Sequence, residues 1–136
     1  HPIMKKAKKN RQPSGGSRIP LYIDLQDAAD YEFNLCGNDT MLGQYARRIF
    51  AKNRLSPITY NENMSVLLAS SMGAAGQGLA FTYYSSRHYF RNAEFLSLGK
   101  DGGTIEISTA LAPGRYHSKA TLALQEVMHE ILEDHV

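Results

Sequence analysis

A stretch near the end of the sequence combines residue types that bind metals in other proteins. His129 and Glu130 begin a His-Glu-x-x pattern, but Glu133 stands where a zinc-protease helix needs its second histidine. Without that histidine the helix lacks the pair of nitrogen ligands that holds zinc. We interpret the stretch as the solvent-facing side of a helix and expect no metal site.

Two further patterns do not lead to a catalytic site. Gly73, Gly76 and Gly78 end a predicted helix and precede a predicted strand, which reverses the strand-loop-helix order of a phosphate-binding loop. Cys36 has no histidine at a spacing that indicates a nucleophile pair, and a buried, unreactive thiol is more common. We therefore expect no catalytic residues, no cofactor and no enzymatic activity.

Polar residues at the starts of two predicted helices are candidates for binding an anion. Asp39 or Thr40 caps a helix over residues 41–52, and Asn63 or Ser65 caps one over residues 64–75. A helix N-terminus has unpaired N–H groups and a partial positive charge, which suit a carboxylate or other small anion. The alternative, favoured for the first loop by its sequence alone, is that the capping side chain already satisfies these groups.

Hydrophobic periodicity predicts the elements that position these loops. It indicates strands over residues 31–35, 57–60 and 79–81, each near a predicted helix, so the strands should be mostly parallel. The first helix has an apolar stripe made of Met41, Leu42, Tyr45, Ala46, Ile49 and Phe50. The second has one made of Met64, Leu67, Leu68, Ser71, Met72 and Ala75. Arg47 is expected to face solvent.

The rest of the chain supplies shorter elements. Residues 1–20 are basic and rich in Pro, Gly and Ser, so we predict a linker or loop, followed by a short helix that Asp24 caps. Residues 82–92 contain many aromatic side chains and predict a short helix that either covers the core or forms a wall for a ligand. Strands are predicted over residues 95–98 and 104–109, and a helix with an apolar stripe begins at Ser118.

Residues 62–83 hold the most specific pattern. An acidic residue, a polar cap and a leucine-rich helix lead into Ala-Ala-Gly-x-Gly-Leu-Ala and an apolar strand. In this order and spacing the stretch resembles the effector-binding domain of LysR-type transcriptional regulators. The opening His1-Pro2 and the closing helix from Ser118 are also similar to that family, so the likeness covers nearly the whole chain. The sequence departs from the family at Thr82 and Tyr83, where a proline is usual.

The resemblance implies an α/β fold with a mostly parallel sheet flanked by helices, like one lobe of the type 2 periplasmic-binding-protein fold. Residues 1–20 would be a basic linker, 21–98 the second subdomain, and 99–136 the strand and helix that return to the first. The DNA-binding helix-turn-helix would lie outside this chain. It also implies a cytoplasmic homodimer or higher homo-oligomer that senses a small molecule. The alternative is a lobe of a solute-binding protein with the same fold.

The effector site is expected where the parallel strands end, because loops at the carboxyl ends of such strands line the ligand crevice. Its predicted residues are Gly37, Asn38, Asp39, Thr40, Asn61, Asn63, Ser65, Thr82 and Tyr83. The chain has 136 residues, a formal net charge of +2 and one cysteine, which suits one domain in a reducing compartment. Its apolar runs are too short to cross a membrane. The basic residues near its start suit only salt-sensitive phosphate contacts, so we expect no specific DNA binding by this chain alone.

Overall fold

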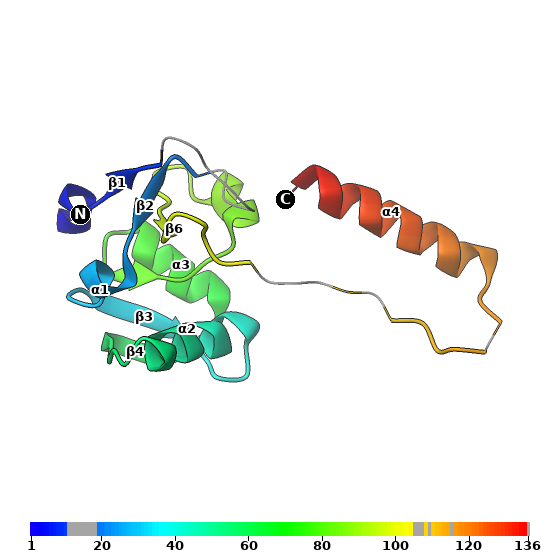
Figure 1. Ribbon diagram of the computed structural model, residues 1–136, viewed down its shortest axis with the longest axis horizontal. Helices are drawn as coiled ribbons and strands as arrows, with labels where there is room; N and C mark the ends of the chain where they lie inside the picture. Colours follow the sequence, from blue (N-terminus) through cyan, green and yellow to red (C-terminus); the bar gives the residue numbers. More distant parts are fainter. Residues whose placement is uncertain (11–18, 105–107, 109, 115, 136) are drawn as a thin grey trace. The chain divides into compact units, whose positions relative to one another are not determined.

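The computed structural model of the protein describes residues 1–10, 19–104, 108, 110–114 and 116–135 (Figure 1). The chain divides into two compact units, residues 1–103 and residues 104–136. The predicted strand over residues 104–109 lies largely outside the described residues. No helix in the described ranges is both long enough and apolar enough to span a bilayer.

The first unit contains a parallel sheet of three strands. Strand β3 (Glu32–Cys36) lies at its centre, between β4 (Ile58–Met64) and β5 (Leu79–Ala80), and pairs in parallel with both. Phe33 of β3 is level with Thr59 on one side and with Leu79 on the other. The three predicted strands and their parallel direction are therefore confirmed.

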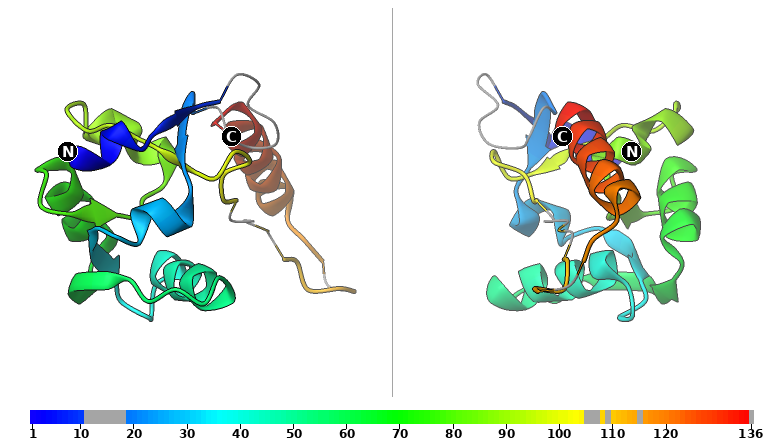
Figure 2. Two further views of the ribbon diagram at one scale, coloured as in Figure 1. Left: turned by 60° about the vertical axis from the view of Figure 1, so that its left-hand side comes forward. Right: turned by 90° about the vertical axis from the view of Figure 1, so that its right-hand side faces the viewer.

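Two helices connect these strands and cover the sheet. Helix α2 (Met41–Lys52) joins β3 to β4, and α3 (Val66–Ala74) joins β4 to β5. Phe33 packs edge-to-face on Phe50 of α2, with ring centroids 5.3 Å apart. The next residue, Asn34, points to the other face and donates a hydrogen bond to the carbonyl of Gln77, just after α3. The helices thus cover opposite faces, and Figure 2 shows them apart in both of its views.

The core of this unit is built around aromatic side chains. Phe33, Phe50 and Phe81 meet with centroid distances between 5.3 and 6.1 Å. Leu42 and Ala46 of α2 are also buried, as the predicted stripe requires. Met41 is an exception, because it is the first residue of the helix and its side chain is 53% exposed.

A second small sheet shows that the start of the chain is not a loop throughout. Strand β2 (Leu21–Ile23) pairs in parallel with β6 (Ser97–Leu98) and antiparallel with β1 (Lys8–Lys9), which follows the 3₁₀ helix η1 (Pro2–Lys5). Ile3 is buried in the core, so the prediction of a linker is wrong for this part. The ammonium of Lys6 lies 2.8 Å from Asp30, and this hydrogen bond raises the pKa of Lys6.

The short helix α1 (Leu25–Ala28) begins after Asp24, as predicted, but is held differently. The side chain of Asp24 makes no capping hydrogen bond and pairs instead with the ammonium of Lys8. This hydrogen bond raises the pKa of Lys8. Asp24 therefore connects β1 to the entry of α1.

Helix α3 turns a different face to the sheet from the one predicted. Leu67 and Leu68 are 69% and 52% exposed, whereas Ala69 is fully buried and Ser70 nearly so. A Cβ on Gly73 would lie 3.2 Å from the Cβ of Ala80 in β5. The helix approaches the sheet so closely that only small side chains fit between them, and this contact excludes the leucines.

Three further predicted features are present among the described residues: the end of α3, a short helix after β5 and a C-terminal helix. Gly76 ends α3 with φ at +78°, the predicted left-handed conformation. The 3₁₀ helix η2 (Tyr84–Tyr89) is the predicted short helix. In the second unit, α4 (Lys119–His135) begins after Ser118, whose hydroxyl accepts a hydrogen bond from the N–H of Thr121 at 3.2 Å.

Candidate functional site

The carboxyl ends of β3, β4 and β5 lie at one edge of the central sheet. Cys36, the last residue of β3, is level with Met64, the last residue of β4. The N–H of Gly37 then donates to the carbonyl of Met64 at 3.0 Å. The loop of residues 37–40 and the start of α3 therefore leave the sheet side by side.

The loop of residues 37–40 is fastened to the first turn of α2. The hydroxyl of Thr40 accepts from the N–H of Gly43 at 3.0 Å and donates to the carbonyl of Gly37 at 2.7 Å. The amide of Gln44 donates to the carbonyl of Asn38 at 3.1 Å. Thr40, rather than Asp39, caps α2, so one of the N–H groups considered for an anion is already satisfied.

Two polar side chains converge on Gly37. A Cβ at this position would lie 2.3 Å from Oδ1 of Asp39 and 2.6 Å from Oδ1 of Asn63. Glycine leaves room for both oxygens here, and a larger residue would displace these two side-chain ends. One oxygen approaches this point from the loop of residues 37–40 and the other from the end of β4, and both can accept hydrogen bonds from a ligand.

The segment before α3 is a strand rather than the predicted polar loop. Strand β4 continues through Asn61 to Met64, with register shifts opposite Asn34 and Cys36. Asn61 is level with Asn34 in the sheet and half-buried, so it lies short of the carboxyl edge. Ser65 follows directly, and its hydroxyl accepts from the N–H of Leu68 at 3.3 Å as the cap of α3.

The third predicted loop is tied to α3 rather than to residues 37–40. The hydroxyl of Ser70 donates to that of Thr82 at 2.8 Å. Tyr83 is half-buried and stands at the N-cap position of η2. In the part of the chain that the structure describes, no hydrogen bond joins Thr82 or Tyr83 to the loop at Gly37.

The prediction that Arg47 faces solvent is wrong, because its side chain lies at this edge. Its Nη1 donates to the carbonyls of Cys36 at 2.9 Å and Gly43 at 3.0 Å, and its Nη2 donates to that of Glu62 at 2.6 Å. One half-buried guanidinium thus joins β3, α2 and β4. The amphipathic pattern of α2 gave no indication of this role, because the acceptors are backbone carbonyls of distant segments.

Two groups near this edge have altered acidities. Burial raises the pKa of the Cys36 thiol, and the positive charge of Arg47 opposes that change. Burial also raises the pKa of Tyr45, whose ring meets that of Phe81 edge-on at 6.2 Å. A thiol held in its protonated form is a poor nucleophile. Among the described residues, no group of three or more His, Cys, Asp or Glu side chains could hold a metal ion.

Comparisons of the chain with protein-family models, with curated proteins and with solved structures find no match. The fold class of the protein is therefore stated from its own structure. The first unit is a mixed α/β structure with a parallel three-stranded sheet flanked by helices. Its polar candidate site consists of Gly37, Asn38, Asp39, Thr40, Asn63 and Ser65, with Asn61, Thr82 and Tyr83 set apart from them.

Proposed function

We propose that the chain is the effector-binding part of a LysR-type transcriptional regulator and senses a small molecule. The observation that carries the proposal is the carboxyl edge of the parallel sheet, where the loop at Gly37 and the start of α3 leave the sheet together. In α/β proteins such an edge is where ligands bind. The pattern of residues 62–83, which resembles this family, supplies one of its loops.

The side chains at this edge favour a ligand that has both an acidic group and hydrogen-bond donors. The N-termini of α2 and α3 suit a carboxylate, although Thr40 and Ser65 each occupy one N–H group. The carboxylate of Asp39 and the amide oxygen of Asn63 are exposed and can accept hydrogen bonds from donors opposite them. A small molecule with a carboxylate and an amino or hydroxyl group would satisfy both requirements.

Assembly and localisation are further parts of the proposal. A cytoplasmic homodimer or higher homo-oligomer agrees with the exposed apolar side chains of Leu67 and Leu68 on α3. Leu124, Val127 and Ile131 on α4 are exposed as well. Contact with operator DNA would belong to a helix-turn-helix encoded outside these residues.

The first test concerns DNA. The protein encoded by the full reading frame is expected to select one operator sequence in a binding-site selection and to retard it in a gel-shift assay at physiological salt. The 136-residue chain alone should give only salt-sensitive retardation without sequence preference. Operator-specific binding by this chain would contradict the assignment of DNA recognition to a separate domain. An export signal in place of a helix-turn-helix upstream of His1 would instead favour the lobe of a solute-binding protein.

The second test concerns the effector site. Small carboxylates that raise the melting temperature of the full-length protein are to be titrated by calorimetry into the wild type and into Asn63→Ala. We expect about tenfold weaker binding, because the substitution removes one hydrogen bond of about 1 kcal/mol or slightly more. Asn53→Ala makes the same change at the exposed C-cap of α2 and should leave the affinity unchanged. Equal affinity in all three proteins would place the effector elsewhere.

A further inference from the structure

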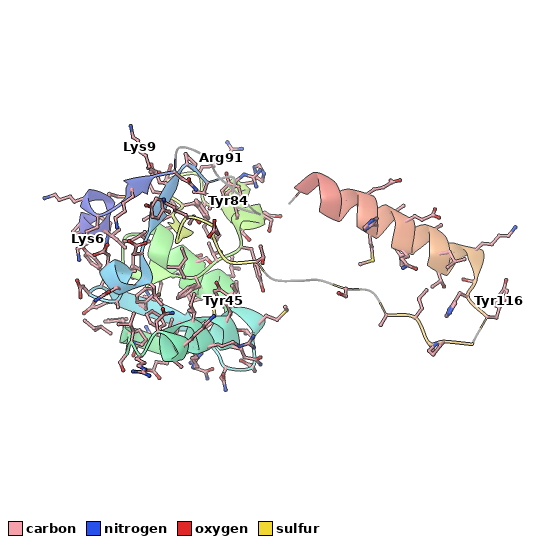
Figure 3. All side chains as sticks on the ribbon, viewed as in Figure 1. Lys6, Lys9, Tyr45, Tyr84, Arg91 and Tyr116 are labelled. Atoms are coloured by element: carbon pink, nitrogen blue, oxygen red, sulfur yellow. The ribbon has the colours of Figure 1, made fainter. Side chains whose placement is uncertain are left out.

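A concave site lies between η2 and the start of β2. It is an open pocket of about 250 Å³, and the residues that matter most to it are Leu21, Tyr84, Arg87, Arg91, Glu94 and Phe95. In Figure 3, Tyr84 and Arg91 lie together in the upper part of the view, and Tyr45 of α2 lies below them. The pocket shares no residue with the carboxyl edge of the central sheet.

One arginine that lines this pocket, Arg87, is held in place by a tyrosine rather than by a carboxylate. The guanidinium of Arg87 lies 4.5 Å from the centre of the Tyr84 ring, and its Nη1 donates to the carbonyl of Tyr84 at 3.3 Å. The Tyr84 ring in turn packs in a T-shaped arrangement with the ring of Phe95, with ring centroids 6.2 Å apart. Arg87 is therefore oriented before any ligand arrives, which lowers the entropy cost of binding.

The charged side chains that line the pocket form no ion pairs within the described part of the chain. Arg87, Arg91 and Glu94 form no ion pair with any other residue in the described ranges, where the ion pairs involve Lys6 and Lys8. Two positive groups and one negative group leave an excess of one positive charge. The pocket thus suits a ligand with a single negative charge, and Glu94 disfavours a second one.

The size and apolar lining of the pocket indicate what carries that charge. Leu21 and Phe95 are half-buried and present apolar surface inside the pocket. An apolar cavity of about 150 Å³ is enough to hold benzene. We propose that this pocket binds a small monocarboxylate with one apolar ring, which packs on Phe95 and Leu21 while Arg91 and Arg87 pair with the carboxylate.

The test is a titration of the isotopically labelled chain with benzoate, followed through its backbone amide NMR signals. Saturable shifts are expected at residues 19–21 and 84–95, with a dissociation constant of about 1 mM. Acetate, which lacks the ring, and benzylamine, which reverses the charge, should each bind at least about tenfold more weakly. Equal binding of benzylamine, shifts confined to residues 37–40 and 63–65, or no saturation by about 10 mM would each overturn the proposal.

Variants separate a specific site from general attraction of anions. Arg91→Gln should weaken benzoate binding about tenfold, because it removes one charge-assisted hydrogen bond. Arg48→Gln removes the same charge from the exposed side of α2 and should change the affinity less than about twofold. Glu94→Gln should strengthen binding, since it removes the only negative group of the pocket. Equal effects of Arg91→Gln and Arg48→Gln, or weaker binding in Glu94→Gln, would contradict this site.

Discussion

Gly43→Ala is expected to lower the free energy of unfolding by about 3 kcal/mol, at the upper end of what overpacking usually costs. A Cβ at this position would lie 2.0 Å from the carbonyl oxygen of Gly37 and 2.6 Å from that of Cys36. Both obstructing atoms belong to the backbone, so no side-chain rotation can relieve the clash. Helix α2 would have to move away from the end of β3, and the loop of residues 37–40 would move with it.

The direction of this effect distinguishes close packing from helix propensity. At an unobstructed position inside a helix, the same substitution would stabilise the protein by about 1 kcal/mol. Urea unfolding followed by circular dichroism measures the change. Gly76→Ala is the control: it meets no atom within 4 Å but has φ at +78°, and it should cost only about 1 kcal/mol. A Gly43→Ala variant as stable as the wild type would show that α2 does not touch the Gly37 backbone.

Arg47→Met is expected to make Cys36 react with a thiol reagent about 30-fold faster under native conditions. Methionine retains much of the aliphatic packing but removes the guanidinium that donates to the carbonyls of Cys36, Gly43 and Glu62. If local opening of this edge becomes easier by about 2 kcal/mol, the reactive fraction rises by that factor. The rate of absorbance change with an aromatic disulfide reagent measures it directly.

The change in the acidity of the Cys36 thiol would slow its labelling, so it cannot explain the faster labelling expected in Arg47→Met. Burial raises the pKa of Cys36 and Arg47 opposes this, so removing Arg47 leaves the thiol less acidic and, by itself, slower to react. Faster labelling must therefore come from opening of the edge. Arg48→Met, at an exposed position of the same helix, should label at the wild-type rate. An unchanged rate in Arg47→Met would mean that the guanidinium does not hold β3, α2 and β4 together.

The sequence predicted the central sheet because its signals are local. The strand at Phe33, the apolar run at Leu79 and the polar residues before each helix depend only on neighbouring residues. The structure confirms both strands, although Asn34 beside Phe33 is fully buried, and it selects Thr40 and Ser65 from the two caps considered for each helix. Gly76 was predicted as a left-handed helix end for the same reason, since its conformation follows from having no side chain. These features set the order of the strands and helices along the chain. That order places the loop at Gly37 and the helix cap Ser65 after the ends of parallel strands.

Elements that depend on distant partners could not be predicted in the same way. Strand β1 has two residues and β2 three, which is too few for a periodic pattern. Strand β6 lies within the predicted strand over residues 95–98, but its pairing with β2 was not predicted. These strands exist because backbone groups far apart in sequence pair with one another. The face of α3 depends on how closely Gly73 approaches Ala80, and that distance decides whether leucine or alanine turns inward.

The sequence by itself indicated which loops lie at the carboxyl edge, because the order of the elements along the chain and the parallel direction of the strands follow from local patterns. Only the tertiary structure decided which side chains meet there: Asp39 and Asn63 converge on Gly37, while Thr82 is bonded to Ser70. It also placed Arg47 against three backbone carbonyls and the residues around Tyr84 beside Leu21. Such contacts depend on distances between segments far apart in the chain, and these distances are set only when the whole unit packs.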